Sequence, residues 1–162
     1  MRFVVKQKVF TLGDNFTIKD DKGIEHFIVR GQIFSLGNKL RIYDMSGQEL
    51  IYIEQKLFRF MPEYNIYYLG RPMATVKKDF TFLKPRFNIH SEKDNYIITG
   101  NFLELDFSIL KNSKKIASVS KSWISWGDTY TIDMLENENH AFILALVIII
   151  DQVLYDNNHN NH

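Results

Sequence analysis

The chain has 162 residues, a formal net charge of +1, 45% hydrophobic and 14% aromatic residues, and no cysteine. This composition predicts one folded globular domain, and the lack of cysteine excludes disulfides, cysteine-ligated zinc and thiol nucleophiles. The N-terminus is charged at Lys6 and Lys8 and lacks the apolar core of a signal peptide, so we expect a cytoplasmic protein.

The first part of the chain repeats itself with a period of 24 residues. Residues 9–23 and 33–47 share the pattern apolar-Phe-[Ser/Thr]-Leu-Gly-x-x-apolar-x-Ile-x-Asp-x-x-Gly, and a fainter third copy keeps Tyr64 and Ile66 in register. The alternating apolar residues predict a strand, and Asp-x-x-Gly predicts a hairpin turn. Both features oppose a helical solenoid or a leucine-rich repeat, which have similar periods.

The same hairpin style continues to residue 135, with a further turn expected at Gly100-Asn101. Strands are expected at residues 24–30, 48–55, 64–69, 73–78, 80–83, 87–90, 94–99, 102–110, 116–124 and 129–135. With the two alternating segments at residues 16–18 and 40–42 of the repeat, about twelve strands are expected. The side chains of an eight-stranded barrel just fill it, so a closed antiparallel barrel of about twelve strands has room for a helix.

Residues 141–150 form an unbroken apolar run. As a helix it would be apolar on every side and about 15 Å long, half of the roughly 30 Å needed to cross a membrane. The β-branched residues 147–150 would also suit a buried strand, but a run of roughly 15 residues without glycine or proline favours a helix. Asn139 suits its N-terminus.

We therefore predict a mainly β domain at residues 1–156, with a hydrophobic helix at residues 139–155 buried inside the barrel. No transmembrane segment is expected, and Asp151 should face a gap at the end of the barrel. Residues 157–162 are expected to form a disordered polar tail. His159 and His162 in this tail could bind a metal weakly, but a frayed terminus is the stronger interpretation.

Several motifs in this order resemble those of the LURP-one-related family. They are Lys-Gln-Lys-Val-Phe-Thr-Leu-Gly at residues 6–13, Phe-Ser-Leu-Gly at 34–37, Asp-x-x-Gly at 44–47, the Trp-Ile-Ser-Trp segment within 121–130, and the apolar run ending at Asp151. The resemblance, which covers nearly the whole chain, implies the fold of Tubby C-terminal domains and phospholipid scramblases, a twelve-stranded barrel around a hydrophobic C-terminal helix.

The functions that this resemblance implies concern lipids. Tubby domains bind phosphoinositide head groups through basic residues, and scramblases are membrane-linked and calcium-responsive. The present chain has no cysteine-rich palmitoylation segment, and residues 20–23 lack the alternating oxygens and the closing glutamate of a calcium loop. Calcium or another metal is therefore not expected.

No motif of known catalytic chemistry is present. The sequence has no glycine-rich phosphate loop, His-Glu-x-x-His helix or Gly-x-Ser-x-Gly elbow, and His26, His90 and His140 are scattered. We predict that the protein is not an enzyme and needs no cofactor. Two functions remain: a binding module for phosphoinositide or another anionic lipid surface, and a protein-interaction or structural barrel without a small ligand.

Charge is unevenly distributed. Residues 56–90 hold seven Lys/Arg and two Asp/Glu, whereas residues 91–162 hold five and ten. This asymmetry indicates either a charged partner or a solvated face. The candidate anion-binding residues surround a predicted hairpin and are expected on one surface, with Arg71 near its opposite end; they are Lys77, Lys78, Lys84 and Arg86.

Aromatic residues are interleaved with the cations of this basic stretch. Such a pattern can bind single-stranded nucleic acid, but the net charge of +1 argues against that partner. We instead expect these aromatic residues to form the barrel wall: Phe58, Phe60, Tyr64, Tyr67, Tyr68, Phe80, Phe82 and Phe87.

Overall fold

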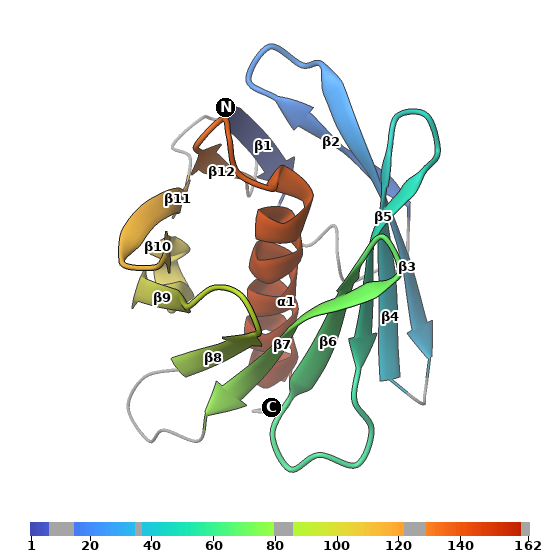
Figure 1. The fold of residues 1–162 in the computed structure, drawn as a ribbon, viewed down its shortest axis with the longest axis vertical. Coiled ribbons are helices and arrows are strands. Elements are labelled where there is room, and N and C mark those ends of the chain that lie inside the picture. Colours follow the sequence, from blue (N-terminus) through green and yellow to red (C-terminus); the bar gives the residue numbers. More distant parts are fainter. Residues whose placement is uncertain (7–14, 35–36, 80–85, 122–128, 160–162) are drawn as a thin grey trace.

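The computed structural model describes residues 1–6, 15–34, 37–79, 86–121 and 129–159. Within these residues, twelve strands form one closed antiparallel barrel around a C-terminal helix (Figure 1). This confirms the predicted fold class. The elements are β1 (Arg2–Lys6), β2 (Phe16–Asp20), β3 (Glu25–Phe34), β4 (Gly37–Asp44), β5 (Glu49–Gln55), β6 (Glu63–Tyr68), β7 (Arg71–Asp79), β8 (Arg86–Ser91), β9 (Tyr96–Asn101), η2 (Phe102–Glu104), β10 (Asp106–Lys111), β11 (Lys114–Lys121), β12 (Thr129–Met134) and α1 (His140–His159).

The barrel has two distinct ends. Each strand pairs with its neighbours in sequence, and β1 pairs with β12 to close the sheet. Because neighbouring strands are antiparallel, successive connections alternate between the ends. We call the end with the β2–β3, β4–β5, β6–β7, β8–β9 and β10–β11 connections the turn end. The other, the loop end, carries the β5–β6 and β9–β10 connections and the last residues of β7, and α1 runs toward it from the turn end (Figure 1).

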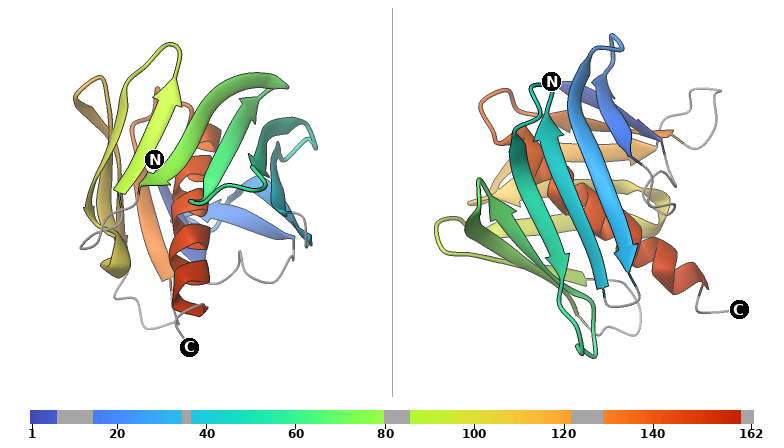
Figure 2. Two further views of the ribbon diagram at one scale, coloured as in Figure 1. Left: turned by 90° about the horizontal axis from the view of Figure 1, so that it is seen from below. Right: turned by 90° about the vertical axis from the view of Figure 1, so that its right-hand side faces the viewer.

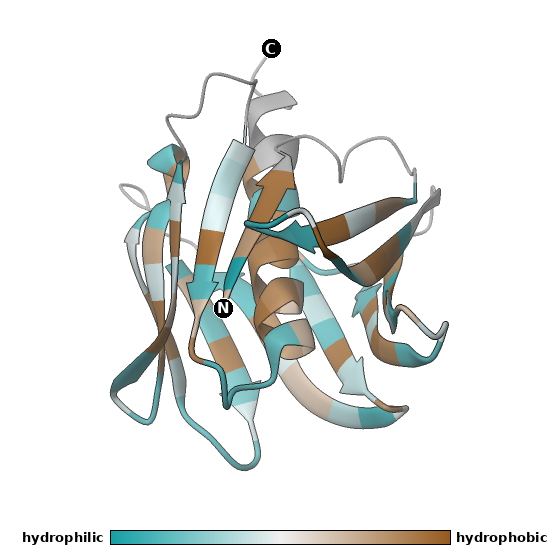
Figure 3. Cartoon of the chain, turned by 90° about the horizontal axis from the view of Figure 1, so that it is seen from above, coloured by the Kyte–Doolittle hydropathy of each residue, from teal (hydrophilic) through white to brown (hydrophobic). Residues whose placement is uncertain are grey.

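Helix α1 is the centre of the core. All of residues 141–150 are buried, and both views in Figure 2 show strands around the helix. Figure 3 colours most of its described length as hydrophobic. The side-chain oxygen of Asn139 accepts a hydrogen bond of 3.0 Å from the backbone N–H of Phe142, which caps the first turn. Each buried large apolar side chain contributes roughly 1.5–3 kcal/mol, so this helix supplies much of the stabilisation.

The helix differs from its predicted bounds mainly at its C-terminal end. It begins at His140 and continues beyond Tyr155 to His159, so residues 157–159 of the expected tail are helical. Among the residues that the structure describes, no helix is long and apolar enough to cross a membrane.

Matching turns at the turn end reflect the 24-residue repeat. The Oδ1 atom of Asp44 accepts hydrogen bonds of 2.9 Å from the backbone N–H groups of Ser46 and Gln48. Asp20 accepts the equivalent two bonds, also at 2.9 Å, from the second and fourth residues after it. Gly47 has a φ of 88°, which a glycine adopts without strain. The turn chemistry expected of Asp-x-x-Gly is thus confirmed.

The repeat also extends to the strand pairing. A register shift follows Ile18, Ile42 and Ile66, which occupy the same position in the three copies. A bulge of this kind bends and twists a strand, as closure of a barrel requires. The fainter third copy is therefore a structural repeat as well.

The turn expected at Gly100-Asn101 is wrong. Strand β9 continues through both residues, and η2 makes the connection to β10. Phe102 is buried, with ring centroids 5.4 Å from those of Phe87 and Phe107. Burial of this ring explains why the chain turns after the glycine and not at it. The predicted strand at residues 80–83 lies outside the described residues.

Asp151 also differs from expectation, because it is buried and does not face an open gap. Its exposed fraction is 7%, and burial raises its pKa to about 6. The fully buried hydroxyl of Tyr130 has a pKa raised well above its ordinary value, by burial and by the charge of Asp151. The core therefore contains a carboxyl group whose ionisation opposes folding.

Candidate functional site

Two of the cations chosen from the sequence lie together on the outer surface of β7 and β8. Lys77 and Arg86 are both exposed. Lys77 is opposite Asn88, and Arg86 is opposite Asp79, so the two cations are diagonal neighbours on one face. The Asp79 carboxylate accepts a hydrogen bond of 2.7 Å from the Asn88 amide. One carboxylate therefore lies beside two exposed cations.

Lys78 has a different environment. It follows Ala74 and Val76 in the row that faces the barrel interior, and it is only partly exposed. Burial lowers its pKa, and none of the described carboxylates pairs with it. A desolvated ammonium group without a counter-charge is unfavourable, and an incoming anion would relieve that cost.

The single surface expected for the four cations is thus divided. Lys77 and Arg86 share the outer face, Lys78 belongs to the inward-facing row at the end of β7, and Lys84 lies outside the described residues. Arg71 begins β7 at the turn end, at the far end of the strand, as expected.

The connection between β5 and β6 brings further cations to the same end of the barrel. The Glu63 carboxylate accepts a hydrogen bond of 2.5 Å from the Lys56 ammonium group, and its other oxygen lies 3.5 Å from Nε of Arg59. Lys77 is opposite Glu63 in the β6–β7 register. The Lys56 hydrogen bond, together with the charges of Lys56, Arg59 and Lys77, holds the pKa of Glu63 below its ordinary value although burial opposes this.

One cationic region therefore occupies part of the loop end. Residues 55–63, 77–79 and 86–88 carry five cations and two carboxylates, and Figure 1 places their segments at its lower end. Farther around the same end, Glu104 and Asp106 are exposed and acidic. We call the five cations the basic rim: Lys56, Arg59, Lys77, Lys78 and Arg86.

Sequence reasoning missed the loop at residues 56–62, which we call the aromatic loop. Phe58 and Phe60, expected in the barrel wall, are 99% and 90% exposed, whereas Tyr64 and Phe87 are buried as expected. Strand β5 ends before the aromatic loop, and β6 begins after it, so neither phenylalanine has a place in the sheet. The run of four apolar residues around one arginine, with no strand alternation, was the available signal.

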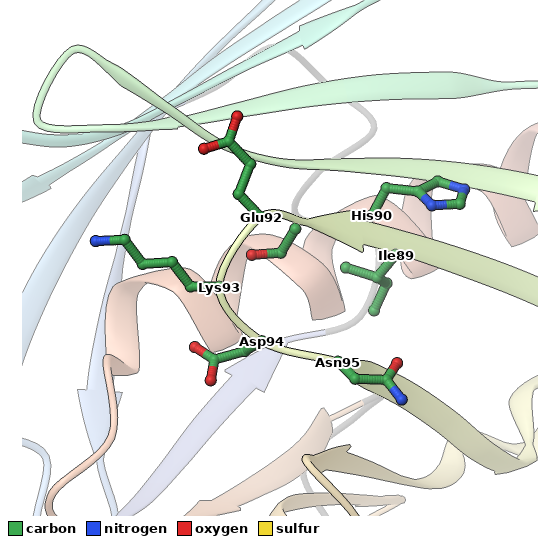
Figure 4. Close-up of a pocket in the computed structure, with 7 residues that line it drawn as sticks. Ile89, His90, Glu92, Lys93, Asp94 and Asn95 are labelled. Atoms are coloured by element: carbon green, nitrogen blue, oxygen red, sulfur yellow. The ribbon is translucent and has the colours of Figure 1, made fainter.

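A shallow hollow of about 490 Å³ at the β8–β9 turn is another region with several charged groups. In Figure 4 the side chain of Glu92 points away from those of Lys93 and Asp94. The Asp94 carboxylate already accepts a hydrogen bond of 2.8 Å from the Asn112 amide. Across the described part of the chain, no group of three or more His, Asp or Glu residues could hold a metal. The side chains that line this hollow therefore do not converge on a common binding point.

Comparison with known proteins gives a consistent result. A family model described as LURP-one-related matches residues 1–151. Protein YxjI of Bacillus subtilis strain 168, itself uncharacterized, is 39% identical over 152 residues, covering 94% of this chain and 93% of that protein. An Arabidopsis thaliana protein with an X-ray structure has the same fold, with a TM-score of 0.68 at 20% identity, covering 94% of this chain and 90% of the other.

Proposed function

The chain belongs to the LURP-one-related family, and on that premise we propose that its barrel is a non-enzymatic module that binds phospholipid head groups of an anionic membrane surface. The binding region is the basic rim at the loop end. Lys78 is the observation that carries the proposal, because it is a partly buried cation to which the described residues offer no carboxylate.

The chemistry of a phosphate-bearing head group suits this region. A phosphate offers several charged acceptor oxygens, which form strong charge-assisted hydrogen bonds with lysine and arginine. Arg86 and Lys77 would hold it from the outer face, and Lys78 would regain a counter-charge. Near an anionic membrane each Lys or Arg contributes about 1 kcal/mol, so a cluster of this size supports measurable binding.

Vesicle binding at low and high salt tests the proposal. The parent should bind phosphatidylcholine vesicles that contain phosphoinositide, and binding should weaken with salt because charges drive it. A variant with Lys77, Lys78, Lys84 and Arg86 all changed to alanine should lose most of this binding.

The matched control removes four exposed cations at the turn end, two in connections and two at the start of β11: Lys22, Lys93, Lys114 and Lys115. Both variants lose the same charge, so only a localised binding region distinguishes them. Equal losses in the two variants, or no binding by the parent, would contradict the proposal. The second outcome would favour the alternative, a protein-interaction or structural barrel.

A further inference from the structure

The aromatic loop exposes several large apolar side chains to solvent. Phe58 is 99% exposed and Phe60 90% exposed, and Leu57 before them is 42% exposed. Single exposed apolar residues are common on proteins, but several exposed apolar residues gathered in one short loop mark interaction sites. The backbone at Phe58 has a φ of 56°, an unfavourable conformation for an aromatic residue. Backbone strain of this kind is found at functional sites.

The base of the aromatic loop is firmly held, so the two rings are presented from a fixed support. The backbone N–H of Lys56 donates to the carbonyl of Glu63 at 2.8 Å, and that of Lys78 donates to the carbonyl of Pro62 at 3.0 Å. Leu57 lies over Gly37, where a Cβ atom would come within 2.8 Å of the leucine side chain. The sheet therefore fixes both ends of the loop and leaves its tip in solvent.

The charges around the tip of the loop indicate which kind of partner would suit it. Arg59 stands between the two phenylalanines in sequence, and the other four cations of the basic rim lie at the same end of the barrel. A hollow of about 430 Å³ beside the loop is lined in part by Asn38, Lys56 and Arg59. Apolar rings that project from a cationic surface are complementary to an anionic membrane, in which apolar chains lie beneath negatively charged head groups.

We propose that the aromatic loop is a membrane-inserting element, with Phe58 and Phe60 entering the head-group and acyl boundary while the basic rim contacts the anionic head groups. This inference rests on the proposed function and adds to it the part of the protein that enters the bilayer. It also sets the orientation, because the loop end faces the membrane and the turn end faces away.

A site-specific label tests insertion directly. The chain has no cysteine, so Phe58→Cys creates one attachment point for an environment-sensitive fluorophore. Ile24→Cys is the matched control, because Ile24 is an exposed apolar residue at a turn-end connection, with an exposed fraction of 57%. With phosphatidylcholine vesicles containing phosphatidylserine, we expect a blue shift and greater intensity at position 58 and no change at position 24.

A second variant, Phe58→Ser with Phe60→Ser, should weaken vesicle binding roughly tenfold or more, from the usual free energies of apolar burial. Its control is Ile24→Ser with Met45→Ser, two exposed turn-end residues, which should leave binding unchanged.

The outcomes separate this inference from the proposed function. Vesicle binding without any change at position 58 would overturn insertion and leave head-group binding intact. No vesicle binding at all would overturn both. A fluorescence change at position 58 that grows with protein concentration, in the absence of vesicles, would assign the loop to a second copy of the chain and overturn insertion.

Discussion

The two ends of the barrel are built by the same kind of connection, yet they differ in what they leave exposed. At the turn end, the side chains of Asp20 and Asp44 satisfy the backbone of their own turns. At the loop end, Phe58 and Phe60 are 99% and 90% exposed to solvent. The side chains of these turn-end residues thus stabilise the fold, whereas the aromatic loop holds two large apolar side chains out in solvent.

The interior links both ends, because α1 runs from one to the other. A destabilising change in the middle of the helix should therefore unfold both ends of the barrel together. A change in a single connection should act only locally. Four stability measurements therefore test whether the interior and the two ends differ in this way.

The largest effect is expected for Ile148→Asp. Ile148 is 1% exposed in the middle of the apolar run, and an unpaired charge there should lower the free energy of unfolding by about 4 kcal/mol or more. Removal of residues 139–162 should likewise abolish soluble folding. Urea unfolding measures the effect, with Ile24→Asp at an exposed turn expected within about 0.5 kcal/mol of the parent. A truncated chain that still melts cooperatively would show that the helix is not the core.

Asp151→Asn should stabilise the protein at neutral pH. Burial raises the pKa of Asp151 from 3.8 to about 6, so the folded state binds its proton more tightly than the unfolded state does. This group therefore reduces stability progressively as the pH rises from about 4 to about 6, and the full penalty remains above that range.

We expect Asp151→Asn to raise the free energy of unfolding by about 2–3 kcal/mol at pH 7 and by little at pH 4. Urea unfolding across this pH range measures the difference in stability between variant and parent. The contributions of the other carboxylates are the same in both proteins and cancel in this difference. A gain that is independent of pH would mean that ionisation of Asp151 is not its source.

Gly47→Ala should destabilise the turn end modestly. The φ of Gly47 is 88°, and no atom lies within 4 Å of the added Cβ, so the expected loss of about 1–2 kcal/mol comes from backbone conformation alone. Thermal unfolding measures it, and Gly31→Ala serves as a control in open space without a positive φ. Equal losses in the two variants would rule out backbone strain as the cause.

Phe58→Gly tests the opposite expectation at the loop end. The φ of 56° at Phe58 disfavours an aromatic residue, and its ring is 99% exposed. Glycine should leave stability unchanged or raise it by up to about 1 kcal/mol, because relief of the backbone strain offsets the flexibility that glycine adds to the unfolded chain. A loss above about 1 kcal/mol would mean that the ring serves the fold after all.

Sequence reasoning succeeded where the controlling chemistry is local. Asp44 and Gly47 form a turn through their own side-chain and backbone preferences, and Asp20 repeats it 24 residues earlier. The helix was equally accessible, because a run that is apolar on every side must be enclosed. The repeat and the apolar run together account for the barrel and its filling.

The remaining features depended on tertiary structure. Whether Lys78 faces inward or outward depends on the strand register, since a shift of one residue reverses the side. Phe58 and Phe60 have the composition of a strand, and only the end of β5 at Gln55 places them outside the sheet. Phe102 overrode the turn preference of Gly100 by packing against Phe87, a residue 15 positions away in the sequence. The errors at Lys78 and Phe102 concern contacts that no local pattern encodes.

Hydrogen exchange of the parent protein, with and without phosphatidylcholine vesicles that contain phosphatidylserine, tests most directly the claim that the loop end is the membrane-facing surface. We expect vesicles to slow exchange at residues 56–62 and at the start of β8, while residues 20–24 and 44–48 exchange unchanged at the turn end. Slower exchange at the turns, or no difference at either end while the vesicles are bound, would show that the loop end is not the membrane-facing surface.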